Sequence, residues 1–268
     1  MLIFPGYQQL FLPQPILSPV SIIRYETYKL FSYKYLNRLV YIKRGVKLFQ
    51  ALRFEKVLPE DRDKINKLTE NTWIWGDYIP DYFDKWVKEG LFIKAVSDGE
   101  ILGIIHARIF EDFTWFEGIR VKQEIRRKGV GKALAKKAME LSPKKIFRLA
   151  ANEKNVPSVQ LAKALGFKEI DMFYFIDGKV YDIKELINEF KLKEVKANLK
   201  NVKGFVNDWV WYPITKYSGK IYSNGELTIL ETNPPFLVNG YLENIRHMSK
   251  NFTSNSEGFI VFELKLNV

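Results

Sequence analysis

The chain of 268 residues contains no cysteine and only two histidines, His106 and His247. The missing thiols exclude disulfides, thiolate metal sites and cysteine nucleophiles. We expect no metal, because a histidine-based metal site would need ligands that the chain hardly has. No apolar run reaches the roughly 18 residues of a transmembrane helix. The apolar first 23 residues contain four prolines and no leading cation, unlike a signal peptide, so a cytoplasmic location is predicted.

Acidic residues are scarce at the start of the chain. Residues 1–50 hold seven Lys/Arg and one acid, Glu26, whereas the whole chain has a net charge of +11. Half of the basicity thus belongs to an N-terminal extension, and no nucleic-acid partner is expected for the remainder. Its segment "RYETYKLFSYKYLNRLVYIKR" fits either a basic amphipathic helix on a membrane or partner, or an unstructured tail, which is the favoured interpretation.

From residue 51 the hydrophobic pattern becomes regular. With 47% hydrophobic residues the chain can bury a sizeable core. Apolar periodicity predicts the order β-α-α-β-β-β-α-β-α-β-β over residues 51–183, with tight hairpins at Asp98-Gly99 and Asp177-Gly178. This order indicates an α/β fold class (an α+β mixed sheet) with helices on the faces of the sheet.

Residues 184–268 show a different pattern. The segment "IKELINEFKLKEVKANL" predicts a helix, and short aromatic strands follow, with a hairpin at Asn224-Gly225. We therefore expect three parts: the extension 1–50, a domain at 51–183, and a smaller C-terminal α+β domain at 184–268.

Two glycines lie among cations in "RRKGVGKAL", residues 126–134. A strand is predicted to end near Val121, and a helix to begin at Gly129–Gly131. The first N–H groups of a helix have no partner within it and lie at the positive end of its dipole, so they form an anion site. A side chain at either glycine would block a phosphate. The segment does not fit a P-loop, which needs Gly-Lys-Ser/Thr four residues after an earlier glycine. It also does not fit a dinucleotide fingerprint, which needs three glycines and an acid beyond the next strand.

The pattern Arg126-x-x-Gly129-x-Gly131 resembles the R/Q-x-x-G-x-G/A motif of the GNAT superfamily, the acetyl-CoA-dependent N-acetyltransferases. The stretch "IRVKQEIRRKGVGKALAKKAM" is similar to the strand, turn and helix of that family. A second segment, "NEKNVPSVQLAKALGFKEI", resembles a later family segment in which an asparagine precedes an apolar helix ending in Gly-Phe. The resemblance covers roughly residues 51–182 and implies the GNAT acyl-CoA N-acyltransferase fold.

The resemblance implies acetyl-CoA as co-substrate, with its pyrophosphate as the bound anion. It also implies that pantetheine pairs with the strand Ile119–Val121, where this strand splays from the segment "KKIFRLA". The residues predicted to bind acetyl-CoA are Ile119, Arg120, Val121, Arg126, Arg127, Lys128, Gly129, Val130, Gly131, Lys132, Asn155 and Ser158.

Acetyl transfer to an amine requires a base, since a lysine-like amine has a pKa of about 10.4 and must lose a proton before it attacks. Glu117 is two residues before Ile119, so regular alternation places it on the same strand face as Ile119 and Val121. We predict Glu117 as the general base, acting directly or through a water, with an ion pair to Arg120 or another surface cation as the structural alternative. His106 alternates with Ile104, and a structural role is predicted for it.

The general acid usual in GNAT enzymes is absent. Many members carry a tyrosine seven residues after the asparagine of the later segment, placed to protonate the leaving thiolate, whereas this chain has Ala162. Tyr174 is predicted as a catalytic substitute, with Tyr181, Tyr78 or an unaided thiolate as alternatives. A non-catalytic acyl-CoA sensor is a further alternative.

The acceptor site is expected at Thr72–Val87, because this region forms one wall of the acceptor pocket in the GNAT fold. The segment resembles the "DYLP…W" segment of the histidine N-acetyltransferase branch, and "FEGIRV" and "GFVNDWVWYP" resemble other parts of that branch. In the predicted site Asp77 holds an ammonium among aromatic faces, and Arg108 meets a carboxylate. The predicted substrate-binding residues are Trp75, Asp77, Tyr78 and Arg108.

The predicted function is acetyl transfer to the amine of a small molecule, a free amino acid such as histidine. A protein N-terminus or a lysine is the alternative acceptor. A monomer or a homodimer is expected.

Overall fold

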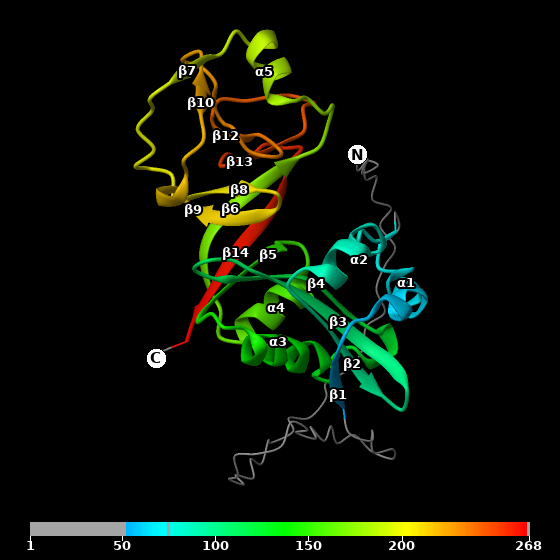
Figure 1. Cartoon of the computed structure of the whole chain (residues 1–268). Coiled ribbons are helices and arrows are strands. Elements are labelled where there is room, and N and C mark those ends of the chain that lie inside the picture. Colours follow the sequence, from blue (N-terminus) through cyan, green and yellow to red (C-terminus); the bar gives the residue numbers. More distant parts are fainter. Residues whose placement is uncertain (1–51, 74–75, 267–268) are drawn as a thin grey trace, which may run out of the picture.

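The computed structural model describes residues 52–73 and 76–266 (Figure 1). The predicted N-terminal extension 1–50 and the predicted substrate-binding residue Trp75 lie outside the described residues. Within the described residues, the predicted order β-α-α-β-β-β-α-β-α-β is confirmed, up to and including the strand that follows Gly166-Phe167.

The first part of the chain alternates strands and helices. Its elements are β1 (Arg53–Lys56), α1 (Arg62–Thr69), α2 (Ile79–Lys88), β2 (Leu91–Ser97), β3 (Glu100–Ile109), β4 (Thr114–Val121), α3 (Val130–Leu141), β5 (Ile146–Asn152), α4 (Val156–Ala164) and β6 (Lys168–Ile176). The hairpin predicted between β2 and β3 is confirmed, and its turn residues Asp98 and Gly99 have φ values of 52° and 78°. Two successive positive φ values are those of a tight type I′ turn.

The C-terminal part is mostly short strands. Its elements are α5 (Ile183–Glu189), β7 (Lys193–Val195), β8 (Gly204–Asn207), β9 (Val210–Pro213), β10 (Ile221–Ser223), β11 (Thr228–Leu230), β12 (Phe236–Asn239), β13 (His247–Ser249) and β14 (Glu257–Lys265). The helix predicted here is shorter than expected, because α5 ends at Glu189 and the following residues form β7. The predicted hairpin at Asn224-Gly225 is confirmed between β10 and β11.

A sheet of twelve strands runs through both parts, in the order β1-β2-β3-β4-β5-β14-β6-β13-β12-β11-β10-β7. The last strand, β14, is thus inserted between β5 and β6, where it pairs antiparallel with both. In Figure 1 it runs from the lower part of the molecule into the upper part. The sheet is therefore continuous across the boundary predicted at residue 183, and that boundary stays a prediction.

The hairpin predicted at Asp177-Gly178 is wrong. After Ile176 the chain leaves the sheet, and Lys179 makes a single isolated bridge to Ile245. Both edges of β6 are already paired, one with β13 and the other with β14. A strand returning from the turn would find no edge free, so long-range pairing overrides the local turn signal.

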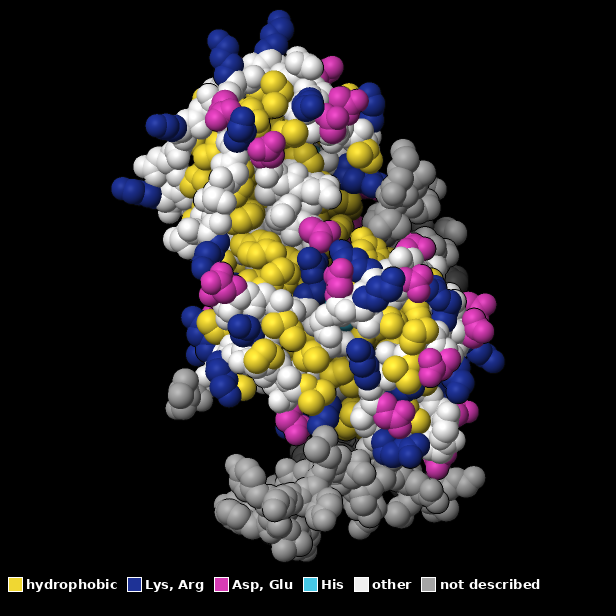
Figure 2. All heavy atoms as spheres, viewed as in Figure 1, with side chains coloured by type: hydrophobic (Ala, Val, Ile, Leu, Met, Phe, Trp, Pro, Cys, Tyr) yellow, Lys and Arg dark blue, Asp and Glu magenta, His cyan; other side chains and the backbone are white. Residues whose placement is uncertain are grey.

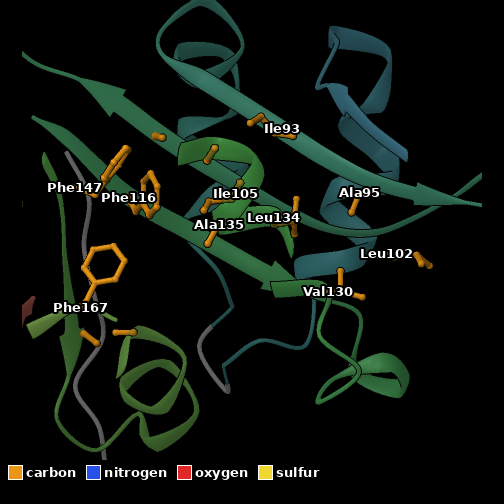
Figure 3. Close-up of a cluster of buried hydrophobic side chains, with 14 of the residues drawn as sticks. Ile93, Ala95, Leu102, Ile105, Phe116, Val130, Leu134, Ala135, Phe147 and Phe167 are labelled. Atoms are coloured by element: carbon orange, nitrogen blue, oxygen red, sulfur yellow. The ribbon is translucent and has the colours of Figure 1, made fainter. Parts of the chain in front are cut away.

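Side chains of the first part form two cores, one on each face of the sheet. Ile105, Phe116, Leu134 and Phe147 belong to the core under α3 and α4, shown in Figure 3. The opposite face carries α1 and α2, whose core includes Ile65, Ile79, Phe83, Trp86 and Ile104. Alternate residues of β3 point to opposite faces, as the two-residue period of a strand requires.

The β8–β9 hairpin packs on the same face of the sheet as α1 and α2. Val206, Val210 and Trp211 of the hairpin share a core with Trp115 of β4 and Phe173 of β6. The hairpin and α2 therefore both lie against the same face of β3 and β4.

Candidate active site

The predicted anion site lies at the N-terminus of α3. Gly129 is its N-cap residue with a φ of 88°, and the first intrahelical bond runs from the Ala133 N–H to the Gly129 carbonyl at 2.9 Å. The N–H groups of Val130, Gly131 and Lys132 therefore have no partner within the helix.

The surface in front of this helix end is open. A Cβ added at Gly129 would meet no atom within 4 Å, and Arg126, Arg127 and Lys132 are exposed beside it. Backbone donors, a helix dipole and cations together fit the diphosphate of coenzyme A. One cation has a further structural contact, because Arg126 Nε donates to the Val121 carbonyl at 3.1 Å.

The splay predicted between the two central strands is confirmed. β4 pairs with β5 only at Thr114–Phe147 and Trp115–Arg148, after which β5 continues along β14. The backbone of β4 from Phe116 to Val121 therefore keeps one edge towards the opening between the strands. This is the edge to which pantetheine was predicted to bind.

α4 begins next to this opening. Its N-cap residue is Asn155, whose side-chain oxygen accepts a hydrogen bond from the Ser158 N–H at 3.3 Å. Capping accounts for the oxygen of this amide, so only its nitrogen is left to donate to a ligand. Binding of acetyl-CoA by Asn155 and Ser158 stays a prediction.

A β-bulge in β4 corrects the predicted face of Glu117. Ile104 pairs with Arg120 but His106 pairs with Glu117, so β4 has one extra residue at Gly118, whose φ is 60°. The extra residue reverses the alternation. Glu117 faces α2, whereas Ile119 and Val121 pack in the core under α3.

Glu117 is held by His106. The two side chains approach at 2.8 Å between Nδ1 and Oε1, while His106 Nε2 lies 2.9 Å from the Glu89 carbonyl. The imidazole stacks on Trp86 at a centroid distance of 4.4 Å. His106 is fully buried, and the Glu117 side chain is 16% exposed.

Both hydrogen-bond partners of His106 are acceptors. The Glu89 carbonyl takes the Nε2 proton, so the contact with Glu117 requires a second proton, either on Nδ1 or on the carboxyl group. Oxygen Oε1 is used by this contact, which leaves Oε2 as the oxygen of Glu117 that can face a substrate. His106 is therefore a structural residue, and its structural role is to hold the side chain of Glu117 in position.

Asp77 is not available to an ammonium, which corrects the predicted role. Its carboxylate accepts from Arg120 Nε at 2.6 Å and Nη2 at 3.1 Å, and from the Ile79 N–H at 3.1 Å. Only 1% of the Asp77 side chain is exposed. The carboxylate is thus fully paired inside the protein. The same ion pair uses the Arg120 side chain, so Arg120 can offer acetyl-CoA only its backbone.

Tyr78 lies over this ion pair, with its ring 5.3 Å from the Arg120 guanidinium carbon. Burial raises the pKa of its phenol, Arg120 opposes the rise, and the charges of Glu117 and Asp77 add to it. The hydroxyl of Tyr78 therefore stays protonated near Glu117.

Arg108 bonds to the C-terminal part of the chain. Its Nη2 donates to Asp208 Oδ2 at 3.1 Å and its Nη1 to the Asp208 carbonyl at 3.3 Å. Burial raises the pKa of the phenol of Tyr82 on α2, and the charges of Asp208 and Glu117 add to the rise. Sequence reasoning missed Asp208, although Asn207-Asp208 between two apolar runs is a turn signal.

Tyr174 is displaced from the reaction site, which corrects its predicted catalytic role. It lies on β6, where it pairs with Ser249 and Gly258, and its hydroxyl donates to the Met172 sulfur at 3.6 Å. The insertion of β14 separates β6 from β5, so two strands lie between β6 and β4. Tyr181 also lies elsewhere, beside Lys179. Ala162 is buried in the core under α3.

The sequence profile of the acetyltransferase (GNAT) family matches residues 62–167. An N-alpha-acetyltransferase of Sulfurisphaera tokodaii is 30% identical over 139 residues, which cover 43% of this chain and 79% of that protein. The chain belongs to the GNAT family. A spermidine N(1)-acetyltransferase of Thermoplasma acidophilum is 23% identical over 159 residues, 49% of this chain and 99% of that protein.

A GNAT fold is also found in the solved structures. The crystal structure of a Thermoplasma acidophilum protein assigned to the acetyltransferases matches 80% of this chain and 100% of its own, with a TM-score of 0.56 and 19% identity. The shared fold therefore reaches well beyond residues 62–167. The chain is a GNAT N-acetyltransferase, and acetyl-CoA is its co-substrate.

Two further observations concern the described residues. Within 52–73 and 76–266, no helix is long and apolar enough to cross a membrane. Over the same ranges, no three His, Cys, Asp or Glu side chains group in a way that could hold a metal ion.

Proposed function

We propose that this GNAT enzyme acetylates the amine of a small molecule, a free amino acid, with Glu117 as the general base. The observation that carries the proposal is the fixed position of Glu117, at the bulge of β4 where β4 leaves β5. Acetyl-CoA supplies the activated acetyl group. Glu117 is a half-buried carboxylate on the strand that borders the cofactor opening, and such acids are commonly functional.

In the proposed reaction Glu117 Oε2 takes a proton from the acceptor ammonium, directly or through one water. The free amine nitrogen then forms the amide bond to the acetyl carbon as the carbon–sulfur bond breaks. The nitrogen releases its second proton, and the leaving thiolate takes one up. The charge of Glu117 helps to raise the pKa of the phenols of Tyr78 and Tyr82 at α2, so both stay protonated, and they replace Tyr174 as candidates for the acid.

Two classes of acceptor, a protein N-terminus and a small-molecule amine, are compatible with membership of the GNAT family. The Sulfurisphaera relative is named for N-alpha acetylation, which keeps a protein N-terminus as the second candidate acceptor. The small-molecule acceptor is supported by the aromatic and charged side chains that surround Glu117 from α2, β3 and the β8–β9 hairpin. A cytoplasmic location and a monomeric or homodimeric state remain part of the proposal.

The test is thiol release from acetyl-CoA with a panel of free amino acids, polyamines and N-terminal peptides. Glu117→Gln keeps the shape and removes the base, so turnover should fall about 10²- to 10⁴-fold. The deficit should shrink as the pH rises, because a larger share of the amine then arrives already deprotonated. Full activity of Glu117→Gln at neutral pH would reduce Glu117 to a structural residue. Acetylation of peptides alone would favour the protein acceptor.

A further inference from the structure

The turn between β8 and β9 is held in a fixed and costly conformation. Asp208 and Trp209 have φ values of 49° and 62°, although neither is glycine. Such backbone states cost about 1–3 kcal/mol each and persist only where the surroundings impose them. Here the Asp208 N–H donates to the Asn233 carbonyl at 2.7 Å, and the Trp209 ring packs on Phe175 at 5.1 Å.

This turn presents Asp208 to Arg108 across 100 residues of sequence. The two side chains remain accessible, with 22% of Arg108 and 42% of Asp208 exposed. The guanidinium is oriented by Phe110, whose ring centroid lies 5.2 Å away. An accessible anion and an accessible cation therefore sit side by side at the junction of β3 and the hairpin.

The pair lies close to Glu117. Arg108 follows His106 by two residues on β3, so it points to the same face, and His106 is the cross-strand partner of Glu117. Diagonal neighbours of this kind are about 7–8 Å apart, a gap that a small molecule can bridge. The charges of Asp208 on the hairpin and of Glu117 on β4 both raise the pKa of Tyr82, a residue of α2.

Figure 2 shows hydrophobic side chains next to Lys, Arg, Asp and Glu side chains at the waist of the molecule, between its upper and lower parts. In Figure 1 the β8–β9 hairpin lies at this level.

We infer that the β8–β9 turn forms the acceptor-selecting wall of the active site, where Arg108 binds the carboxylate of a zwitterionic α-amino acid and Asp208 holds its ammonium until Glu117 takes the proton. The inference rests on the proposed function and names its substrate class. A zwitterion gives each partner of the ion pair a new counter-charge, so no buried charge is left unpaired. A polyamine brings only cations to Arg108, and a peptide N-terminus brings no adjacent carboxylate.

The test compares three acceptors that differ only in the carboxylate: histidine, histidinamide and histamine. The parent enzyme should prefer histidine. Asp208→Asn should raise the KM for histidine at least about tenfold and leave the KM for acetyl-CoA unchanged. Arg108→Gln should abolish the preference for histidine over histamine. Asp112→Asn is the matched control, since Asp112 forms an exposed ion pair with Lys216 at 2.6 Å and should behave as the parent.

A second variant separates substrate binding from a purely structural ion pair. The double variant Arg108→Asp with Asp208→Arg keeps the pair but exchanges its charges, so its KM for histidine should stay raised at least about tenfold while its melting temperature remains near that of the parent. A KM for histidine returned to the parent value by the exchange would overturn the inference, as would equal use of histidine and histamine by the parent. Failure of the parent on every amine would instead overturn the proposed function itself.

Discussion

His106 can be changed so that one of its two hydrogen bonds is kept at a time. In His106→Asn the amide nitrogen takes the place of Nδ1 and still donates to Glu117. In His106→Gln it takes the place of Nε2 and donates to the Glu89 carbonyl. Both variants lose the ring that stacks on Trp86, so their losses of packing are similar. The comparison therefore isolates the contact with Glu117.

The expected magnitude follows from burial. His106 is fully buried and the Glu117 side chain is 16% exposed, so the 2.8 Å contact is a shielded hydrogen bond to a charged group. Such bonds contribute about 1.5–3 kcal/mol. That energy corresponds to roughly 10- to 150-fold in rate if the whole loss falls on the transition state. We expect this fall in kcat for His106→Gln and a clearly smaller one for His106→Asn.

The assay is thiol release at saturating acetyl-CoA, with melting temperatures to establish that both variants fold equally. A positioning role predicts that kcat changes while the KM for acetyl-CoA does not, because the anion site at α3 is separate from His106. Equal losses of kcat in the two variants, or a larger loss in His106→Asn, would refute the reasoning. The histidine would then only fill space beside Trp86.

Two further predictions concern binding and stability. Gly129→Val should abolish CoA binding in calorimetry, because its side chain would fill the open surface at a φ of 88°, and unchanged CoA affinity would refute the anion site. Gly131→Ala should bind CoA and fold normally, since its Cβ would point at Leu161, Ile119 and Val121, at an ordinary 3.4 Å from Leu161; this corrects the prediction that a side chain at either glycine would block a phosphate. Burial lowers the pKa of His247, so the unfolded chain binds a proton at higher pH than the folded protein, and stability should decline as the pH falls below about 6.5. His247→Asn, which keeps a donor for the Ile245 carbonyl, should flatten this fall in Tm, and an unchanged slope would contradict the assignment.

The fold up to β6 was predictable because local chemistry decides it. The Asp98-Gly99 turn makes a hairpin because the strands on either side of it pair with each other, whereas Asp177-Gly178 follows a strand that is already paired on both edges. The glycines at the start of α3 act through the backbone around them. The pairing of β14 was not predictable in the same way. Its apolar run indicates a strand, but nothing local states that it enters the sheet between β5 and β6.

The bulge at Gly118 left a signal that could have been used. A lone glycine within a strand pattern often marks a bulge or a close approach of another group, and both hold here. A Cβ at Gly118 would lie 2.4 Å from the Trp86 ring, so the indole can pack over the backbone only at a glycine. The same indole supports His106, which in turn supports Glu117. Strict alternation along β4 overlooked this, and so placed Glu117 on the wrong face.

The two substrates of the enzyme differ in how far their binding residues are spread along the chain. The site for acetyl-CoA is built from one strand, one turn and the helix that follows, because a diphosphate is recognised by consecutive backbone N–H groups. The acceptor side that we propose draws on α2, β3, β4 and the β8–β9 turn, where Arg108 contacts Asp208, a residue 100 positions away in the sequence. A donor common to a whole family can be bound by one short motif, whereas each acceptor needs its own charges. If Asp208 selects the acceptor as we infer, its position on a turn of the C-terminal strands lets the acceptor change without disturbing the anion site at α3 or the bulge at Gly118 that positions Glu117.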